Sequence, residues 1–304
     1  MVDARVGYLG PEGSYSHEAV LTLSDVEPVA FVSLEDLLGA VGDASIDQGL
    51  VPIENALEGT VSATIDGLVF DHDLVMIQEI VLPIHLHLLA RPGVTLSEIT
   101  KVRSFVHALA QVRSFVHERR LETHHTSSTS QAARDVADSS EPWGAIGSSL
   151  AATIFGLDVV AADIGDHPEN VTRFVLVGRE AVAAPTGHDR TTIVCFQDAD
   201  RPGSLYAILG RFAARDINLT KLESRPTKRG LGEYCFVIEF EGHVADDVVA
   251  DCLTDLQAHL ARVKFLGSYP VTGEGATDRR EEVAQARHSA AQWIESIRAR
   301  VRHD

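Results

Sequence analysis

The first 178 residues alternate between strand-like and helix-like segments, and this alternation constrains the fold more than any other feature of the chain. Short apolar runs typical of strands occupy residues 6–9, 29–32, 49–53, 74–80, 144–146 and 174–177. Amphipathic stretches lie between them, and the one at 34–41 begins with a capping box formed by Ser33 and Asp36. Strands that alternate with helices are typical of an α/β domain with largely parallel sheets.

A second pattern begins after residue 189. Residues 181–189 are rich in alanine and contain Pro185 and Gly187, which indicates a linker. The next segment predicts strand, helix, two strands, helix and strand, which is the βαββαβ order of a small ferredoxin-like domain. These elements are expected at 191–196, 205–215, 219–224, 234–240, 246–259 and 263–269.

The tail after Gly275 alternates charged residues with alanine. Trp293, Ile294, Ile297 and Val301 recur there at helical spacing. We therefore expect an amphipathic helix that packs on its own chain or on a partner subunit.

The chain is strongly acidic, because 26 Lys and Arg residues against 44 Asp and Glu residues give a net charge of −18. Such a surface repels nucleic acid and anionic lipid, so neither is an expected partner. No apolar run approaches the roughly 20 residues that span a bilayer, and the N-terminus lacks the pattern of a signal peptide. We therefore expect a cytoplasmic protein. Cys195, Cys235 and Cys252 lack metal-type spacing and are expected to be free thiols, the first two inside strands.

An anionic ligand would still need a local positive site in this acidic chain. The first hundred residues contain only two basic side chains, Arg5 and Arg91. Backbone N–H groups at helix starts, together with a few arginines, are therefore expected to provide such a site.

Polar segments follow the predicted strands at several points. Ser14 and Ser16 lie in a Gly-rich turn before a helix, where an anion could meet free N–H groups, and a simple tight turn is the alternative. Glu54 and Asn55 follow an apolar strand, the position where ligands gather in α/β folds. A structural hydrogen bond from Asn55 is the competing interpretation.

Three further segments complete the set of candidate site residues. Ser104 and Gln111 bound one of them. Residues 126–130 are five consecutive hydroxyl residues before an alanine-rich helix, which predicts a helix cap with donors for a carboxylate, or else a flexible loop. In residues 172–174 a hydroxyl and an arginine adjoin just before a strand, which makes this the sharpest candidate, although a surface arginine at a strand end is the alternative.

Together these segments resemble the prephenate dehydratase family, in the family's order and at similar intervals. The residues that carry the resemblance are Gly10-Pro11, Gly13-Ser14-Tyr15-Ser16, Val51-Pro52-Ile53-Glu54-Asn55 and Thr172-Arg173-Phe174. A further group resembles the ACT regulatory domain attached to these enzymes: Pro202-Gly203-Ser204-Leu205, Asn218 and Glu223-Ser224-Arg225-Pro226. The resemblance covers roughly residues 5–270.

This resemblance implies an architecture. A catalytic domain, residues 1–182, is expected to have two lobes like a type II periplasmic binding protein, with the site in the cleft between them. One lobe would comprise roughly residues 1–78 with 160–182, and the other residues 79–159. An ACT domain at 190–270 and a helical tail at 271–304 would follow. No chorismate-mutase segment precedes the catalytic domain, so a monofunctional enzyme is expected.

The resemblance also implies a reaction, the conversion of prephenate to phenylpyruvate, water and carbon dioxide for L-phenylalanine biosynthesis. Aromatisation drives this reaction, so no cofactor or metal is expected. Thr172 would assist the leaving hydroxyl, Arg173 would hold a carboxylate, and Phe174 would exclude water. The implied positions for the remaining contacts with substrate are Asn55, Ser104 and Gln111, supported by Glu54, with Ser14, Ser16, Ser128, Thr129 and Ser130 for the other carboxylate.

For the ACT domain the resemblance implies phenylalanine as an allosteric effector and a homodimer or homotetramer. The matching positions are Gly203, Ser204, Leu205, Asn218, Glu223, Ser224, Arg225 and Pro226. The family usually has Gly-Ala-Leu-Val where this chain has Gly203-Ser204-Leu205-Tyr206. It usually has Ser-His-Pro-Gln-Ala-Leu-x-Gln over residues 104–111, so that Phe105 and His107 depart from the family pattern.

Three other functions fit parts of the sequence. An arogenate dehydratase would perform the same elimination on the amino analogue of prephenate. A non-enzymatic ligand sensor would suit a two-lobed domain joined to an ACT domain. A metalloenzyme is suggested by 14 histidines, including His85, His87 and the pair His124-His125, but no zinc-type spacing accompanies them.

Overall fold

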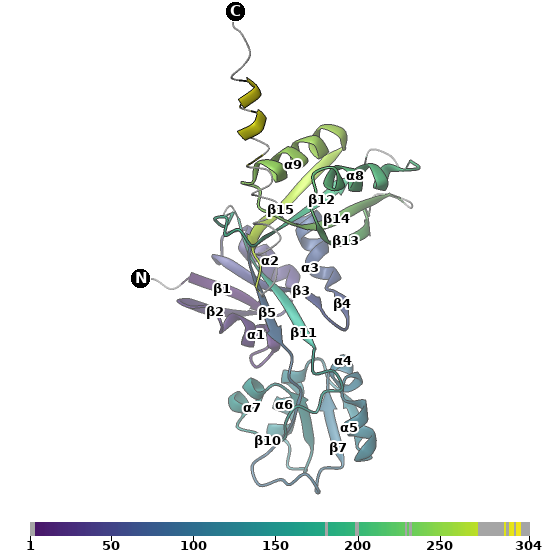
Figure 1. Cartoon of the computed structure of the whole chain (residues 1–304). Coiled ribbons are helices and arrows are strands. Elements are labelled where there is room, and N and C mark those ends of the chain that lie inside the picture. The colour runs from purple at the N-terminus through teal and green to yellow at the C-terminus, as the bar shows by residue number, and fades with distance from the viewer. Residues whose placement is uncertain are drawn as a thin grey trace, which may run out of the picture. The chain divides into compact units, whose positions relative to one another are not determined.

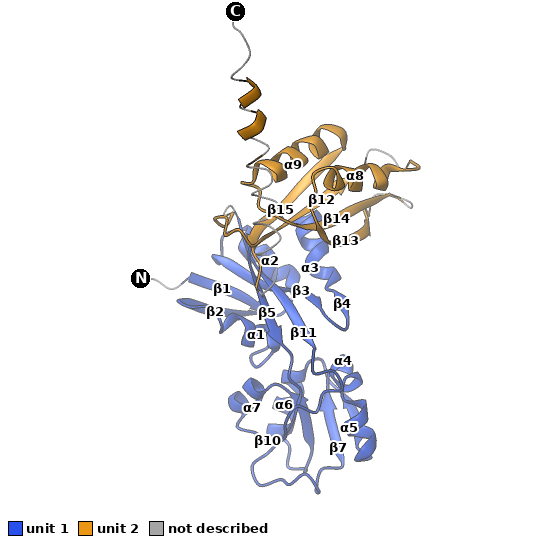
Figure 2. Ribbon diagram, viewed as in Figure 1, with its two compact units in different colours: residues 1–181 blue, residues 182–304 orange. Residues whose placement is uncertain are grey.

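The computed structural model describes residues 4–179, 182–197, 201–228, 230, 233–272, 289, 292–294 and 296–298. The chain divides into two compact units, Met1–Ala181 and Val182–Asp304 (Figure 2). Each unit is built from strands and helices (Figure 1), and those of unit 2 follow the predicted order.

The first sheet of unit 1 has the strand order β2-β1-β3-β11-β5, with the short β4 paired to β3. Its strands are β1 (Ala4–Leu9), β2 (Val26–Phe31), β3 (Gln48–Asn55), β4 (Gly59–Thr60), β5 (Val75–Pro83) and β11 (Val171–Gly178). The helices of this lobe are α1 (Tyr15–Val20), α2 (Leu34–Gly42) and α3 (Ser62–Asp66), followed by the π-helical turn η1 (Gly67–Asp71). The β-strands that enclose β1 are parallel to it, whereas β11 is antiparallel to both β3 and β5.

The second sheet of unit 1 repeats this arrangement in the order β8-β7-β9-β6-β10. Its strands are β6 (His87–Ala90), β7 (Lys101–Ser104), β8 (Glu122–His125), β9 (Gly144–Gly147) and β10 (Asp158–Ala161). The helices of this lobe are α4 (Val106–Ala110), α5 (Arg113–Glu118), α6 (Thr129–Ala137) and α7 (Ser149–Phe155). Here β7 is parallel to both of its neighbours, β8 and β9, and β6 is antiparallel to both β9 and β10. The two-lobed α/β fold is therefore as predicted, but the expectation of largely parallel sheets is wrong, because the strand that enters each sheet from the other lobe pairs antiparallel with its neighbours.

The antiparallel strand of each sheet is the one that enters it from the other lobe. The chain leaves the first sheet after β5 and enters the second as β6, then leaves after β10 and returns as β11. The two crossover segments are tied together, since Ile84 N donates to Asn170 O at 2.8 Å and Ile164 N donates to Leu86 O at 2.8 Å. The lobe boundaries expected at 78/79 and 159/160 fall inside β5 and β10.

Serine side chains begin several of the helices. Ser14, Ser33, Ser128 and Ser148 each accept a hydrogen bond from the backbone N–H three residues further on, at the starts of α1, α2, α6 and α7. Such a bond satisfies one of the free donors of the first helical turn and typically stabilises a helix by about 1 kcal/mol. The predicted cap at Ser33 and Asp36 is confirmed, with a Ser33 Oγ to Asp36 N distance of 3.0 Å.

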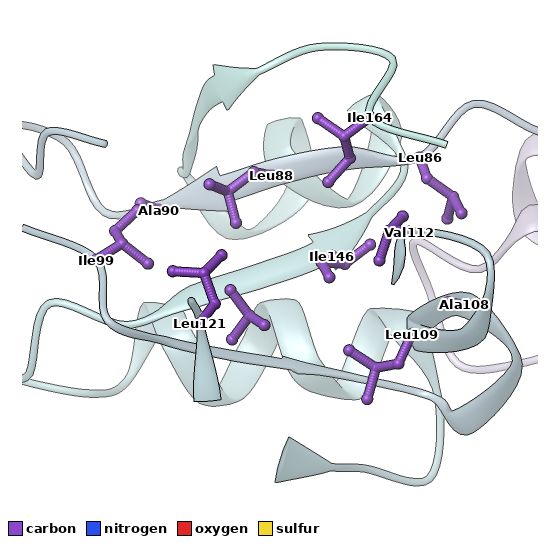
Figure 3. Close-up of a cluster of buried hydrophobic side chains, with 11 residues drawn as sticks. Leu86, Leu88, Ala90, Ile99, Ala108, Leu109, Val112, Leu121, Ile146 and Ile164 are labelled. Carbon is purple, nitrogen blue, oxygen red and sulfur yellow. The ribbon is translucent and has the colours of Figure 1, made fainter. Parts of the chain in front are cut away.

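The core of the second lobe lies where its sheet meets α4 and the segment that follows (Figure 3). Leu88 and Ile146 come from neighbouring strands and are both fully buried. Leu109 from α4 and Ile164 from the return crossover pack against them. Because residues far apart in the sequence share this cluster, it holds the second lobe and its crossover together.

Unit 2 is a four-stranded sheet in the order β13-β14-β12-β15, and its pairs are antiparallel. Its elements are β12 (Asp189–Phe196), α8 (Ser204–Ala213), β13 (Leu219–Pro226), β14 (Tyr234–Glu241), α9 (Asp247–His259) and β15 (Arg262–Pro270). Cys195, Cys235 and Cys252 are buried free thiols, as predicted. In the predicted tail helix, Trp293, Ile294 and Ile297 are helical, and Val301 lies outside the described residues.

Within the described ranges no helix combines the length and hydrophobicity needed to cross a membrane. In the same residues no group of three or more His, Cys, Asp or Glu side chains is arranged to hold a metal ion.

Leu88→Ala is expected to lower the free energy of unfolding by about 3 kcal/mol, because it leaves a cavity in a fully buried cluster. Ile154→Ala, at a site 37% exposed in the same lobe, should cost about 1 kcal/mol or less. Urea unfolding, monitored by circular dichroism, measures the free energy of unfolding of both variants. Equal effects would show that this cluster is not the core of the lobe.

Candidate active site

A cavity of about 980 Å³ lies between the two lobes of unit 1. Its wall combines residues of the first lobe, of the crossovers and of the second lobe. The lining residues are Leu9, Gly10, Pro11, Ser14, Tyr15, Ser16, Ala30, Phe31, Val32, Asn55, Glu58, Val61, Ile84, Leu86, Phe105, His107, Ala108, Gln111, Ser127, Ser128, Thr129, Gln131, Asn170 and Thr172.

Thr172 and Asn55 lie side by side in this wall because β11 pairs with β3 at this register. Asn55 Nδ2 donates to Thr172 Oγ1 at 3.0 Å. Asn55 Oδ1 accepts the backbone N–H groups of Leu57 and Glu58 at 2.9 and 3.0 Å, which fixes the orientation of the amide. Thr172 Oγ1 is therefore the acceptor in its bond with Asn55, and its own proton can be donated to a ligand.

A chain of side-chain hydrogen bonds extends from this pair to the second lobe. Asn55 Nδ2 also donates to Asn170 Oδ1 at 2.9 Å, and Asn170 Nδ2 donates to Gln111 Oε1 at 3.0 Å. Gln111 Nε2 in turn donates to Glu58 Oε1 at 3.4 Å. Each amide thus has a defined orientation, set at one end by backbone N–H groups and at the other by a carboxylate that accepts.

The start of α6 forms another part of the wall. Ser127, Ser128 and Thr129 line the cavity there, and Ser128 Oγ caps the helix by accepting from Gln131 N at 3.0 Å. Helix starts present free N–H groups and a partial positive charge. Across the cavity, Ser14 caps α1 in the same way, and its hydroxyl donates to Leu9 O at 3.0 Å. The polar surface therefore suits a carboxylate.

The lining residues include no lysine or arginine. Tyr15 is held neutral, because burial raises the pKa of its hydroxyl and nearby Glu18 raises it further. That hydroxyl donates to His85 O at 2.7 Å, in the crossover between β5 and β6. An anion in this cavity must thus be bound by N–H and O–H groups rather than by a cationic arginine or lysine side chain.

Two family models match the chain, "Prephenate dehydratase" over residues 6–182 and "ACT domain" over residues 191–257. The chain belongs to the prephenate dehydratase family. The predicted family, and with it the predicted enzyme class of a carbon–oxygen lyase, are confirmed.

Relatives match the chain over most of its length. A prephenate dehydratase of Mycolicibacterium vanbaalenii is 36% identical over an alignment of 314 positions that covers 96% of this chain and 98% of that protein. One from Bacillus subtilis is 36% identical over 279 residues, covering 87% of this chain and 98% of that protein. The solved structure of prephenate dehydratase from Arthrobacter aurescens in complex with L-Phe has a TM-score of 0.86 and 38% identity, covering 96% of this chain and 99% of that chain.

Seven of the site residues suggested by the resemblance to prephenate dehydratases line the cavity: Ser14, Ser16, Asn55, Gln111, Ser128, Thr129 and Thr172. Ser104 and Ser130 do not, because both are fully buried and their hydroxyls are used inside the protein. Ser104 Oγ donates to Ile146 O at 2.7 Å, and Ser130 Oγ donates to Glu12 O. Here these two serines support the segments that form the wall, and their predicted contact with substrate stays a prediction.

Arg173 lies on the opposite side of β11 from Thr172, because neighbouring residues of a strand point to opposite faces. It is 9% exposed and is absent from the cavity wall. Its guanidinium pairs with Glu54 Oε2 at 2.9 Å and with Glu79 Oε2 at 3.2 Å. In this structure Glu54 is a partner of Arg173, and contact of either residue with a substrate stays a prediction.

Phe174 is 1% exposed and packs in the core beneath the first sheet, with Tyr8 and Val20. Phe174 is not among the residues that line the cavity, and its predicted role in excluding water stays a prediction. The aromatic side chains that line the cavity are Tyr15, Phe31 and Phe105, besides the imidazole of His107.

Glu58, His107 and Asn170 are wall residues that sequence reasoning did not place among the functional positions. Glu58 and Asn170 lie within or beside the segments that carry the family resemblance, and this position is the sequence signal that could have identified them. His107 Nδ1 lies 2.7 Å from Glu58 Oε2, so the two residues link the lobes.

Arg173→Ala is expected to lower the free energy of unfolding by about 3 kcal/mol, because Glu79, only 2% exposed, loses a cationic partner. Lys101→Ala, which removes the exposed pair with Glu122, should cost less than about 1 kcal/mol. Chemical denaturation measures the free energy of unfolding of the two variants. Normal stability combined with a raised KM would instead place Arg173 at the substrate.

Proposed function

We propose that the cavity between the lobes is the active site in which prephenate loses its ring carboxylate as carbon dioxide and its 4-hydroxyl as water. The observation that carries the proposal is the Thr172 hydroxyl, which lines the cavity while its oxygen accepts from Asn55 Nδ2. Aromatisation of the ring drives the reaction, so the site needs no group that stores electrons or accepts a hydride.

The bond changes define what the site must do. The electron pair of the breaking carbon–carboxylate bond enters the ring, and the carbon–oxygen bond at ring carbon 4 breaks. The departing hydroxide takes up one proton to become water. Thr172 donates a hydrogen bond to this oxygen, and a proton passed through it is replaced from solvent. Because the pKa of an alcohol lies far above neutrality, hydrogen bonding to the developing hydroxide is the main contribution.

The two carboxylates of prephenate have different needs. The carboxylate that stays in the product is bound at the start of α6, where Ser127, Ser128 and Thr129 combine hydroxyls with free N–H groups. The carboxylate that leaves as neutral carbon dioxide gains from apolar surroundings, which Phe31, Ile84 and other apolar lining side chains supply. Gln111 and Asn170 orient the ring between these ends.

Thr172→Ala should lower kcat by roughly 10²–10⁴, because it removes a donor aimed at the leaving group. Thr172→Ser keeps the hydroxyl and should retain most of the activity. Phenylpyruvate formation is measured at neutral pH with chelator present. Near-normal turnover of a folded Thr172→Ala enzyme would exclude Thr172 from the mechanism.

We also propose that unit 2 binds L-phenylalanine and regulates the enzyme in L-phenylalanine biosynthesis. The related Arthrobacter aurescens structure is described as a complex with L-Phe. Here Gly203, at φ +85°, is the N-cap of α8, and Ser204 and Leu205 are the first residues of the helix, so free backbone N–H groups are available for a carboxylate. Asn218 directly precedes β13, the strand that contains the segment 223–226. An effector that binds one conformational state more tightly shifts the balance between states.

Equilibrium dialysis is expected to show binding of L-phenylalanine and much weaker binding of D-phenylalanine. Asn218→Ala should weaken L-phenylalanine binding on the order of tenfold through loss of a polar contact. Thr254→Ala, on the exposed side of α9, should leave it unchanged. Absence of any binding would remove the regulatory proposal and leave the enzyme assignment intact.

A cytoplasmic homodimer or homotetramer is the assembly that we propose. In the described sheet of unit 2, β13 stands at an edge, and Leu222 on it is 44% exposed. Edge strands offer backbone donors and acceptors that a second copy can pair with. If two copies paired through unit 2, residues of both chains would lie close to each effector site.

A further inference from the structure

The side chains of Glu58 and His107 contact each other across the cavity wall. Glu58 lies in the turn between β3 and β4 of the first lobe, and His107 lies on α4 of the second. His107 Nδ1 is 2.7 Å from Glu58 Oε2, with the two side chains 50% and 42% exposed. The Phe105 ring packs against His107 with the ring centres 5.1 Å apart, which holds the imidazole in place.

This pair dominates the charge of the cavity. Among the lining residues, all within the described part of the chain, Glu58 is the only carboxylate and His107 the only side chain able to carry a positive charge. With the imidazole protonated, the pair has no net charge. Without His107, a carboxylate would face the ligand in a cavity that offers no lysine or arginine to balance it.

We propose that the Glu58–His107 pair determines whether the site prefers a keto diacid or its amino analogue. This inference rests on the proposed function and specifies its substrate class. Prephenate carries two carboxylates and a keto group, whereas arogenate carries an ammonium group in place of the keto oxygen. An unpaired Glu58 repels the dianion and attracts the ammonium, so His107 makes the site selective for prephenate.

Glu58 also contacts Gln111, so a substitution in the pair could act by displacing Gln111 rather than by changing the charge. Glu58 Oε1 accepts from Gln111 Nε2 at 3.4 Å, so Glu58 also helps to place Gln111. A displaced Gln111 would impair both substrates alike. The ratio of kcat/KM for prephenate to that for arogenate therefore isolates the charge of the pair from its positioning effect.

The experiment measures this ratio for the unmodified chain, His107→Leu, Glu58→Gln and the double variant. His107→Leu is expected to shift the ratio on the order of tenfold toward arogenate, mainly through a higher KM for prephenate, as one unpaired charge near a bound ion requires. Adding Glu58→Gln to His107→Leu should return the ratio to within about threefold of its original value, because the uncompensated charge is gone.

His124→Leu is the matched control, because His124 pairs with Glu122 at 3.0 Å in the same lobe but does not line the cavity. It should leave the ratio unchanged. An unchanged ratio in His107→Leu, or a shift that persists in the double variant, would overturn the proposal. His107→Gln, which keeps a hydrogen-bond donor without the charge, should also shift the ratio and serves if His107→Leu unfolds. Failure of the proposed function would look different, since turnover by the unmodified chain would then be absent or independent of Thr172.

Discussion

The pairing of β11 with β3 is the constraint on which the site depends. β11 returns from the second lobe and enters the first sheet antiparallel, with Thr172 opposite Asn55 and Arg173 opposite Glu54. The alternation of a strand places Arg173 on the face of β11 opposite Thr172 and Phe174, where Glu54 and Glu79 enclose it. Thr172 lines the cavity, and Phe174 is buried in the core. The ion pairs and the core contact fix the register that brings the reactive hydroxyl to the cavity.

Much of this arrangement could be predicted from local sequence. Alternating strand and helix patterns predicted the lobes, and the position of Asn55 after an apolar strand predicted that it faces a ligand site. The orientation of Arg173 was also available in principle, since adjacent strand residues cannot both face one ligand. The prediction instead placed Arg173 at the substrate, because basic residues are few in this part of the chain and an arginine suits an anionic ligand. Glu79, whose carboxylate pairs with Arg173, lies in β5 and carries no local signal of this role.

The chain of amides could not be predicted, because it joins segments that only the tertiary structure brings together. Asn55 comes from β3, Gln111 from the end of α4 and Asn170 from the return crossover. Their hydrogen bonds, at 2.9 to 3.4 Å, connect both lobes with the return crossover. The run of hydroxyls at 126–130 shows the same limit, since Ser128 and Thr129 line the cavity while the adjacent Ser130 is fully buried.

The charge of the whole chain gives these local contacts their importance. With a net charge of −18 and no lysine or arginine in the cavity wall, an anionic ligand is not drawn in by the general field of the protein. Its binding must come from oriented N–H and O–H groups, whose dipoles act only over short distances. In such a site a single unbalanced carboxylate has a large effect, because no neighbouring cation in the wall offsets it. The cavity therefore depends on the histidine that faces Glu58 more than a site lined with arginines would.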